Sequence, residues 1–538
     1  MKQRFSLLLF ALLSPIIAFC QDPDSTNTVG IDEKINAAFK PIAETVGGIV
    51  FYSVSIAGNS IPIVLIVLIA SALFFTLYFK FPNIRYFGLA IKTVKGDYYE
   101  APSDSSPKIV VSDNTRDTIL DDIPDTIRDE SAQGEVTPFQ ALTAALSATV
   151  GLGNIAGVAV ALSLGGPGAT FWMILAGLLG MATKFTECTL GVKYRDIDAD
   201  GTVHGGPMYY LSKGLKEKGL GGLGKVFAAF FALMCVGGSF GGGNMFQANQ
   251  AAAQFIATFD IHSSSAGFLF GLIIAFLVGV VIIGGIKRIG QVTEKVVPFM
   301  AVLYVGTALI IIFMNFSSIP TAFGLIFSGA FSSTAIAGGI VGVLIQGFKR
   351  AAFSNEAGVG SAAIAHSAVR TAHPASEGMV ALLEPFIDTV IICTMTALVL
   401  IITNIDGSIM TYGLKAPDGV GVTSLAFEST ISGSSYILTI AVILFAFSTM
   451  LSWSYYGLQA WKYLFGKSTV SDLTYKILFC IFAVIGASIS LGAVVDFSDA
   501  MIFAMVFPNV IGLLILAPVV REEVAKYIEF TKNYKKSE

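Results

Sequence analysis

Charged residues are scarce in this sequence. They make up 13% of its 538 residues, whereas a soluble domain carries about 25%. The five cysteines show no zinc or disulfide spacing, and the four histidines (His204, His262, His366 and His373) lie too far apart to suggest a metal site. Hydrophobic residues make up 54%. This composition excludes an ordinary soluble domain and predicts an all-α polytopic membrane protein. No nucleophile or metal constellation indicates an enzyme, and we expect no nucleic-acid partner.

The N-terminus resembles a secretory signal. Lys2 and Arg4 precede an apolar run that ends at Ala18-Phe19-Cys20. We predict a signal peptide over residues 1–20, with a first membrane helix and a lipid-modified Cys20 as alternatives. Residues 21–60 then form an extracytoplasmic segment that includes the amphipathic stretch "INAAFKPIAETVGGI".

Long apolar runs fill most of the remaining chain, and most exceed the ~20 residues that span a bilayer. We predict a first transmembrane helix at 61–79, followed after a loop by the main membrane-spanning part at 137–520. Eleven spans are predicted: 61–79, 138–164, 169–192, 226–257, 266–285, 294–315, 333–352, 380–403, 435–461, 474–492 and 497–520.

Basic residues fix the predicted orientation. With the N-terminus outside, only Lys34, Lys40 and Lys415 of the mature chain fall on the outer side, as the positive-inside rule requires. Two segments are then predicted to be cytoplasmic. They are a loop at 80–136, which contains an acidic, polar insertion at 96–136, and the tail at 521–538. We expect an integral protein of the bacterial inner membrane with a cytoplasmic C-terminus.

The run "ALSATVGLGNIAGVAVAL" contains glycines in the middle of a predicted span. Gly151 and Gly153 unwind a helix at low cost, and Asn154 adds a polar side chain at the same level. An unwound turn inside a bilayer is tolerated only where it is buried in protein or faces a polar cavity. There its N–H groups attract a carboxylate and its carbonyls hold a cation. Close helix packing through Gly153 and Gly157 is the alternative.

A second interruption follows in "GFKRAAFSNEAGVGSAAIAHS". The two interrupted helices occupy corresponding positions in two predicted halves of five helices each. Paired broken helices indicate a transporter with inverted repeats. If Lys349 and Arg350 mark the cytoplasmic surface, the motif is an inner loop and Glu356 is solvated. If the chain instead turns back into the membrane, Glu356 faces the cavity.

Polar side chains interrupt two further spans. Asn244, Gln247, Asn249, Gln250 and Gln254 exceed what interhelical hydrogen bonding usually needs, so at least one is expected on a ligand path. In "FAFSTMLSWSYYG", Ser448 and Thr449 offer hydroxyl oxygens that suit Na⁺, although serine and threonine often only bond to their own helix.

Together these motifs resemble the sodium–alanine symporter family, also called alanine or glycine:cation symporters. The matching segments are "ALSATVGLGNIAG", "GGPMYYL", "GNMFQAN", "GGIKRIG", "KRAAFSNEAGVGSA" and "FSTMLSWSYYG", within a likeness over about residues 45–525. The resemblance implies a LeuT-like five-plus-five inverted repeat with one extra N-terminal helix. It implies substrate contacts at Thr149, Gly151, Gly153, Asn154, Gln247, Phe353, Asn355 and Trp453. By similarity to the wider fold, Na⁺ would bind Ser147, Val150, Ser448 and Thr449.

The resemblance further implies symport of Na⁺ with a small neutral amino acid, alanine or glycine, by alternating access. The chain departs from the family pattern in its signal peptide, in its acidic insertion, and at Leu152, where a threonine is expected. Proton coupling is the main alternative. Its candidate carriers are Glu356 and Glu187, although Glu187 is expected nearer the inner surface. An ion channel is a more distant alternative.

Overall fold

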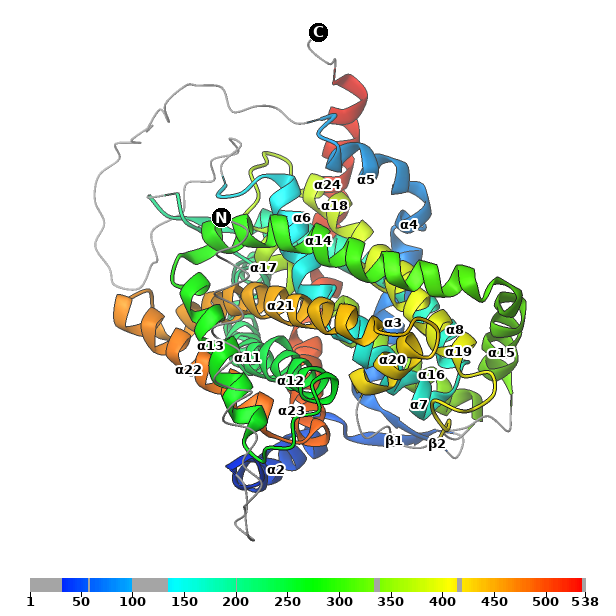
Figure 1. The fold of residues 1–538 in the computed structure, drawn as a ribbon. Helices are drawn as coiled ribbons and strands as arrows, with labels where there is room; N and C mark the ends of the chain where they lie inside the picture. Colours follow the sequence, from blue (N-terminus) through cyan, green and yellow to red (C-terminus); the bar gives the residue numbers. More distant parts are fainter. Residues whose placement is uncertain are drawn as a thin grey trace, which may run out of the picture.

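The computed structural model describes residues 31–56, 59–98, 134–199, 201–332, 339–413 and 419–534. The predicted signal peptide and most of the acidic insertion lie outside these ranges. Helices dominate (Figure 1), and the strands of the described residues form two short antiparallel hairpins. The strands are β1 (Ser53–Ile56), β2 (Asn59–Pro62), β3 (Asp196–Ile197) and β4 (Val203–His204).

The first helices precede the predicted core. The amphipathic stretch forms α2, which packs against α23 through an edge contact of Phe39 with Phe497 at 5.1 Å between ring centroids. The predicted extra span forms α3, a mostly apolar helix without charged residues. The bounds are α2 (Ile31–Val50), α3 (Ile63–Tyr78), α4 (Pro82–Arg85) and α5 (Phe87–Val94).

The first predicted break is present. α6 (Pro138–Thr149) starts at a capping box, in which Thr137 and Gln140 satisfy each other's backbone N–H groups. It ends at Thr149, and the chain resumes as η1 (Gly153–Gly157) and α7 (Val158–Gly165) after a bend of 47°. All residues of the break and of η1 are buried. This geometry excludes a continuous helix turned toward lipid.

The second predicted break is also present. α16 (Gly339–Asn355) stops in the middle of the motif, and α17 (Ala362–His366) follows an irregular turn. Within that turn Glu356, Gly358 and Gly360 have positive φ angles, which glycine adopts without strain but glutamate rarely does. Glu356 is only 2% exposed, so the structure selects the buried placement over the inner loop.

The remaining helices surround these two interrupted ones (Figure 1). Several contain a π-helical segment. Their bounds are α8 (Ala169–Lys193), α9 (Pro207–Tyr209), η2 (Tyr210–Gly214), α10 (Leu215–Glu217), α11 (Gly221–Phe240), η3 (Gly241–Met245), α12 (Phe246–Thr258), α13 (Ala266–Ile282), α14 (Gly285–Met314), η4 (Phe316–Ser318), α15 (Ile319–Phe331), α18 (Pro374–Pro385), η5 (Phe386–Cys393), α19 (Thr394–Thr403), α20 (Gly419–Glu428), α21 (Ser434–Phe465), α22 (Thr469–Ser488), α23 (Leu491–Ala504) and α24 (Val506–Asn533).

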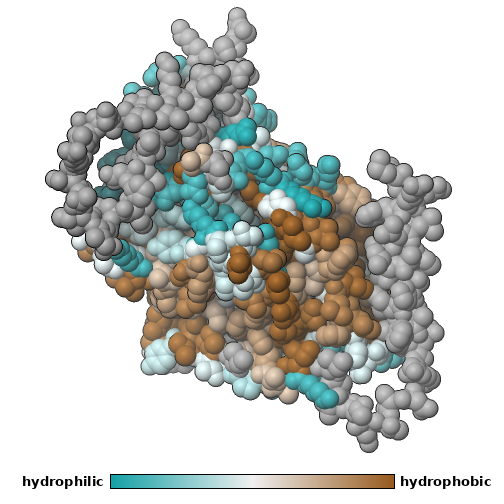
Figure 2. Space-filling model, turned by 90° about the vertical axis from the view of Figure 1, so that its left-hand side faces the viewer, coloured by the Kyte–Doolittle hydropathy of each residue, from teal (hydrophilic) through white to brown (hydrophobic). Residues whose placement is uncertain are grey.

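Seven helices of the described chain are long and apolar enough to cross a membrane, or eight when the bent pair counts as one span. Three further apolar helices, α3, α13 and the pair η4–α15, are shorter. Figure 2 shows a broad hydrophobic band on the molecular surface between more hydrophilic ends. Large side chains such as Phe276, Val302 and Phe313 are exposed. The chain is therefore an integral membrane protein, while the count of eleven spans and the inverted repeat stay predictions.

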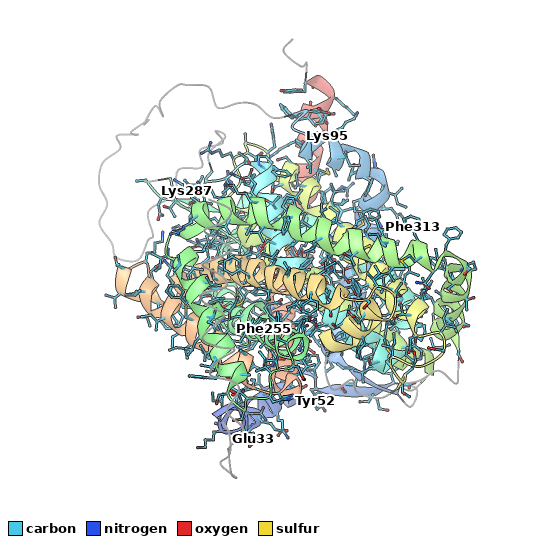
Figure 3. All side chains as sticks on the ribbon, viewed as in Figure 1. Glu33, Tyr52, Lys95, Phe255, Lys287 and Phe313 are labelled. Carbon is cyan, nitrogen blue, oxygen red and sulfur yellow. The ribbon has the colours of Figure 1, made fainter. Side chains whose placement is uncertain are left out.

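The two ends of the bundle differ. Lys95 and Lys287 lie at the end from which the C-terminal helix α24 emerges, whereas Glu33 and Tyr52 lie at the opposite end (Figures 1 and 3). We call the first of these the basic end. Its position matches the charge bias that the positive-inside rule associates with the cytoplasm.

The closest helix packing joins α8 to α18. Gly378 of α18 touches α8 directly, since a Cβ at this position would lie 2.0 Å from the Thr189 hydroxyl and 2.8 Å from the Phe185 carbonyl oxygen. Gly306 of α14 is also helical, but a Cβ added there would meet nothing within 4 Å.

Gly378→Ala should therefore destabilise the bundle by about 1–3 kcal/mol through overpacking. Gly306→Ala should be neutral or stabilising, because alanine is the better helix former. The melting temperature of each purified variant in detergent measures the difference. Equal melting temperatures for the two variants would contradict this prediction, because α8 and α18 could then move apart without a loss of stability.

Candidate functional site

A small cavity lies where the two interrupted helices meet. Its volume is about 10 Å³, which is about the room that one water molecule needs. The break of α6, the start of α12, the end of α16, and α21 and α23 wall it. Six of the eight predicted substrate residues line it: Thr149, Gly151, Gly153, Gln247, Phe353 and Trp453.

Side chains satisfy the backbone N–H groups that the break of α6 frees. The N–H of Gly151 donates to Asn154 Oδ1 at 2.9 Å, and the N–H of Leu152 donates to Gln247 Oε1 at 3.2 Å. The Nε2 of Gln247 donates to the Gly242 carbonyl at 2.9 Å. Gln247 thus holds the unwound turn with the same kind of oxygen that a carboxylate would present.

The other two predicted substrate residues, Asn154 and Asn355, do not line the cavity. Asn154 is fully buried behind the break, and its Nδ2 donates to the carboxylate of Asp388 at 2.6 Å. The Nδ2 of Asn355 donates to Thr389 Oγ1 at 2.9 Å, and its Oδ1 accepts the N–H of Ala357 at 3.0 Å. Both amides therefore shape the two breaks from behind.

Asp388 is a site residue that the sequence reasoning missed. It is fully buried in η5 and accepts hydrogen bonds from Asn154, Ser354 and Thr389, with Ser354 Oγ at 2.9 Å and Thr389 Oγ1 at 2.7 Å. These donors are all neutral, and no ion pair joins Asp388 to a described cationic side chain. The signal that was overlooked is a lone carboxylate in the apolar run "FIDTVIIC", because such residues are usually functional.

Three of the four predicted Na⁺ ligands lie in direct contact between α6 and α21. Thr449 Oγ1 donates to the Ser147 carbonyl at 2.9 Å, and Ser147 Oγ donates to the Ser448 carbonyl at 2.8 Å. The fourth, Val150, begins the break. A Cβ on Gly151 would lie 2.5 Å from Thr449 Oγ1. The unwound turn therefore lies directly against the hydroxyl of α21.

Glu356 brings a carboxylate to the cavity. Its Oε1 accepts the indole N–H of Trp453 at 3.0 Å, and its Oε2 accepts the hydroxyl of Ser361. The carboxylate thereby fixes the Trp453 ring as a wall of the cavity. Trp453 in turn packs so closely on α11–η3 that a Cβ on Gly243 would lie 2.2 Å from its ring.

A buried ionic chain supports the second break. Lys184 Nζ donates to the Asn355 carbonyl at 2.8 Å and lies 3.3 Å from Glu384 Oε2. His366 bridges Glu384 and Glu377, with its Nδ1 2.6 Å from Glu377 Oε1. All four side chains are 0–1% exposed. The sequence reasoning did not assemble them, because they come from three separate helices.

Glu187, the other candidate proton carrier, lies inside the protein. It is fully buried, and Asn509 Nδ2 donates to its Oε1 at 2.8 Å. It does not line the cavity.

Five amide side chains of η3 and α12 lie between Asn244 and Gln254. One of them lines the cavity, and the other four bond to neighbouring helices. Gln247 lines the cavity, whereas Asn244 donates to the Phe479 carbonyl at 2.6 Å and Asn249 to the Gly486 carbonyl at 3.0 Å. Gln250 and Gln254 likewise bond to neighbouring helices. The prediction that at least one amide reaches the cavity is consistent with this arrangement.

Three π-helical segments converge on the site. η1 carries Asn154, η3 directly precedes the turn of Gln247, and η5 carries Asp388. A π-helical turn widens a helix by one residue and often marks a functional position. Here it turns polar side chains toward the interior of an otherwise apolar bundle.

A cavity inside an apolar bundle, walled by two interrupted helices with freed peptide groups, is typical of membrane transporters. The model of the sodium:alanine symporter family matches residues 118–538. The chain therefore belongs to the sodium:alanine symporter family, which is a transporter family and not an enzyme family.

Individual relatives agree. The sodium/alanine symporter AgcS of Methanococcus maripaludis is 43% identical over 76% of this chain and 88% of its own length. The probable sodium/glutamine symporter GlnT of Bacillus subtilis is 35% identical over 74% and 79%. The putative sodium/proton-dependent alanine carrier YrbD of the same organism is 36% identical over 72% and 80%. Among solved structures, MhsT in complex with L-phenylalanine aligns with a TM-score of 0.48 at 14% identity, over 73% of this chain and 99% of that one.

Gly151→Ala tests the contact between the broken helix and α21. The added methyl group would lie 2.5 Å from Thr449 Oγ1 and 3.4 Å from Gln247 Oε1, so the turn has to move away from both. We expect sodium-dependent alanine uptake to fall at least about tenfold, the effect of roughly 1.4 kcal/mol. Gly157→Ala is the matched control, because nothing lies within 4 Å of that position. Similar uptake by the two variants at equal expression would contradict the assignment.

Proposed function

We propose that this protein couples Na⁺ entry to the uptake of a small neutral amino acid, alanine or glycine, by alternating access. The observation that supports it best is the unwound turn at Val150–Leu152. Its Leu152 N–H donates to Gln247, which lines the cavity, and a Cβ on Gly151 would lie 2.5 Å from Thr449 Oγ1. The protein would lie in a bacterial inner membrane, with its N-terminus outside and its basic end facing the cytoplasm.

The substrate carboxylate replaces Gln247 in this proposal. The Leu152 N–H now donates to Gln247 Oε1, and the positive end of the following half-helix favours an anion at that point. Rotation of the Gln247 side chain frees the N–H group and enlarges a cavity that is too small for an amino acid. The ammonium then meets freed carbonyls and the Glu356 carboxylate.

Large side chains restrict the size of the substrate. Phe353 and Trp453 line the cavity, and Ile502 closes it from α23. Phe246 packs edge-on against Phe353 at 5.3 Å between ring centroids. These rings leave room for a methyl group or a hydrogen, which favours alanine and glycine. The relative named for glutamine shows that the family does not by itself fix the size of the side chain.

The coupling ion lies between α6 and α21 in this proposal. Ser147 and Val150 offer carbonyl oxygens, and Ser448 and Thr449 offer hydroxyl oxygens, which are the hard ligands that Na⁺ prefers. Binding there fastens the mobile broken helix to α21. The ion gradient then drives the accumulation of substrate, because the closed state forms only when both are bound.

Proton coupling is the second candidate, and the two buried carboxylates favour it. Glu356 lines the cavity, and Asp388 has only neutral hydrogen-bond donors. An ionised carboxylate without a cationic partner is costly inside a membrane protein. We therefore infer that a bound cation or a proton balances Asp388 during the cycle.

Labelled-alanine uptake into proteoliposomes tests the function. Na⁺, K⁺ and pH gradients are imposed one at a time, and we expect accumulation with the Na⁺ gradient alone. Accumulation driven by the pH gradient alone would replace Na⁺ by H⁺ as the coupling ion. Alanine uptake at the same rate with and without each of the three gradients would reject secondary active transport.

Asp388→Asn removes the negative charge while keeping the shape of the side chain. If a transported cation balances this charge, the cation concentration for half-maximal uptake should rise at least about tenfold, or roughly 1.4 kcal/mol. Asp406→Asn is the control, because the same change then falls on an exposed carboxylate. Sodium and pH dependences that match those of the unmodified protein would show that Asp388 carries no charge in the cycle.

A further inference from the structure

A second cavity lies on the opposite face of α21 from the central one. Its volume is about 160 Å³. Trp453 lines the central cavity, whereas Leu458 and Lys462 line the second. At 3.6 residues per turn, Lys462 lies roughly 180° around the helix from Trp453. The body of α21 therefore separates the two cavities, and the second is not part of the substrate site.

The second cavity lies at the basic end and has two charged poles. Gly285 and Ile286 form one wall. They directly precede Lys287, which lies at the basic end (Figure 3). Glu135 forms one pole, with its Oε1 accepting the N–H of Val203 at 2.8 Å and no ion pair to a described residue.

The opposite pole has a surplus positive charge. Lys462 Nζ lies 3.3 Å from Asp472 Oδ1, and Lys476 Nζ lies 2.6 Å from Asp472 Oδ2. Two ammonium groups thus share one carboxylate. All three side chains are partly exposed, at 13–23%, so a ligand entering from the basic end reaches them.

We propose that this cavity binds a second molecule of the transported amino acid, as a free zwitterion. Its ammonium group would meet Glu135, and its carboxylate would meet Lys462 and Lys476. An apolar cavity of about 150 Å³ accepts benzene, which has as many heavy atoms as alanine, so the volume fits. Ile282, Ile286 and Leu458 between the poles suit a small apolar side chain. The identity of the ligand rests on the proposed function.

The occupant would hold the basic end closed. The N–H of Glu135 donates to the Ala368 carbonyl at 2.8 Å, and Val136 forms a parallel bridge with Val369. The segment before α6 is thus fastened to the segment after α17. A zwitterion between Glu135 and Lys462 would fasten both interrupted helices to α21. Amino acid that accumulates at the basic end would then slow its own uptake.

Equilibrium binding of labelled alanine to the purified full chain tests the site. Na⁺ has no ligand role in the second cavity, so binding there should persist in sodium-free choline buffer. Glu135→Gln keeps the acceptor for the Val203 N–H but removes the charge, and Lys462→Met removes the surplus positive charge of the other pole. We expect each to weaken sodium-free binding at least about tenfold, since each removes a charged hydrogen-bond partner.

Lys467→Met is the matched control. It removes a lysine that is 49% exposed, pairs with Asp198 and does not line the cavity. Sodium-free binding by the unmodified chain that Glu135→Gln and Lys462→Met leave unchanged, or no sodium-free binding at all, would overturn the proposal. Failure of the proposed function would appear separately, as the absence of a sodium-dependent component.

The regulatory effect has its own readout. With equal alanine on both sides of proteoliposomes, exchange by the unmodified chain should slow at high alanine concentrations. Glu135→Gln should keep the same rate at low concentration and lose this inhibition. Inhibition that persists in the variant would overturn the closing role.

Discussion

The structure depends on one constraint: peptide groups that leave a helix inside an apolar bundle have to find other partners. Asn154 accepts the N–H of Gly151, Gln247 accepts that of Leu152, and Thr449 donates to the carbonyl of Ser147. These three side chains come from η1, α12 and α21. The break in α6 is therefore stabilised by its own continuation η1 and by two other elements, α12 and α21, and the cavity forms at the same place.

Buried charge is the second consequence. The peptide groups of the α16 break need partners as well, and Lys184 supplies one by donating to the Asn355 carbonyl. A buried ammonium group needs a counter-ion, which Glu384 provides, and His366 extends the chain to Glu377. Leaving any one of these charges unpaired is costly, so the four side chains act as one unit. They fix α8, α17 and α18 around the turn that carries Glu356.

The sequence predicted the features that local composition determines. Glycines beside a polar residue in an apolar run marked the breaks, and six predicted residues reach one cavity because the family motifs fix their helices. Asp388 and the Lys184 chain were missed because one carboxylate in an apolar run does not reveal its partners. Asn154 was placed in the cavity, although its amide faces Asp388 behind the break. The direction in which a side chain of a broken helix points depends on the angle between its two halves. No single residue of the sequence determines this angle, which is 47° here.

The hydrogen bonds that close the cavity are also the ones that ligands would replace. Gln247 accepts from the Leu152 N–H as a carboxylate would, and the Thr449 hydroxyl meets the Ser147 carbonyl where a cation would lie between them. Each ligand thus exchanges one internal contact for a stronger, charged one. Because the same interrupted helix carries both contacts, moving it for one ligand would expose the groups that bind the other. In the proposed function, coupling between ion and amino acid would then follow from sharing one interrupted helix, without a longer pathway between separate sites.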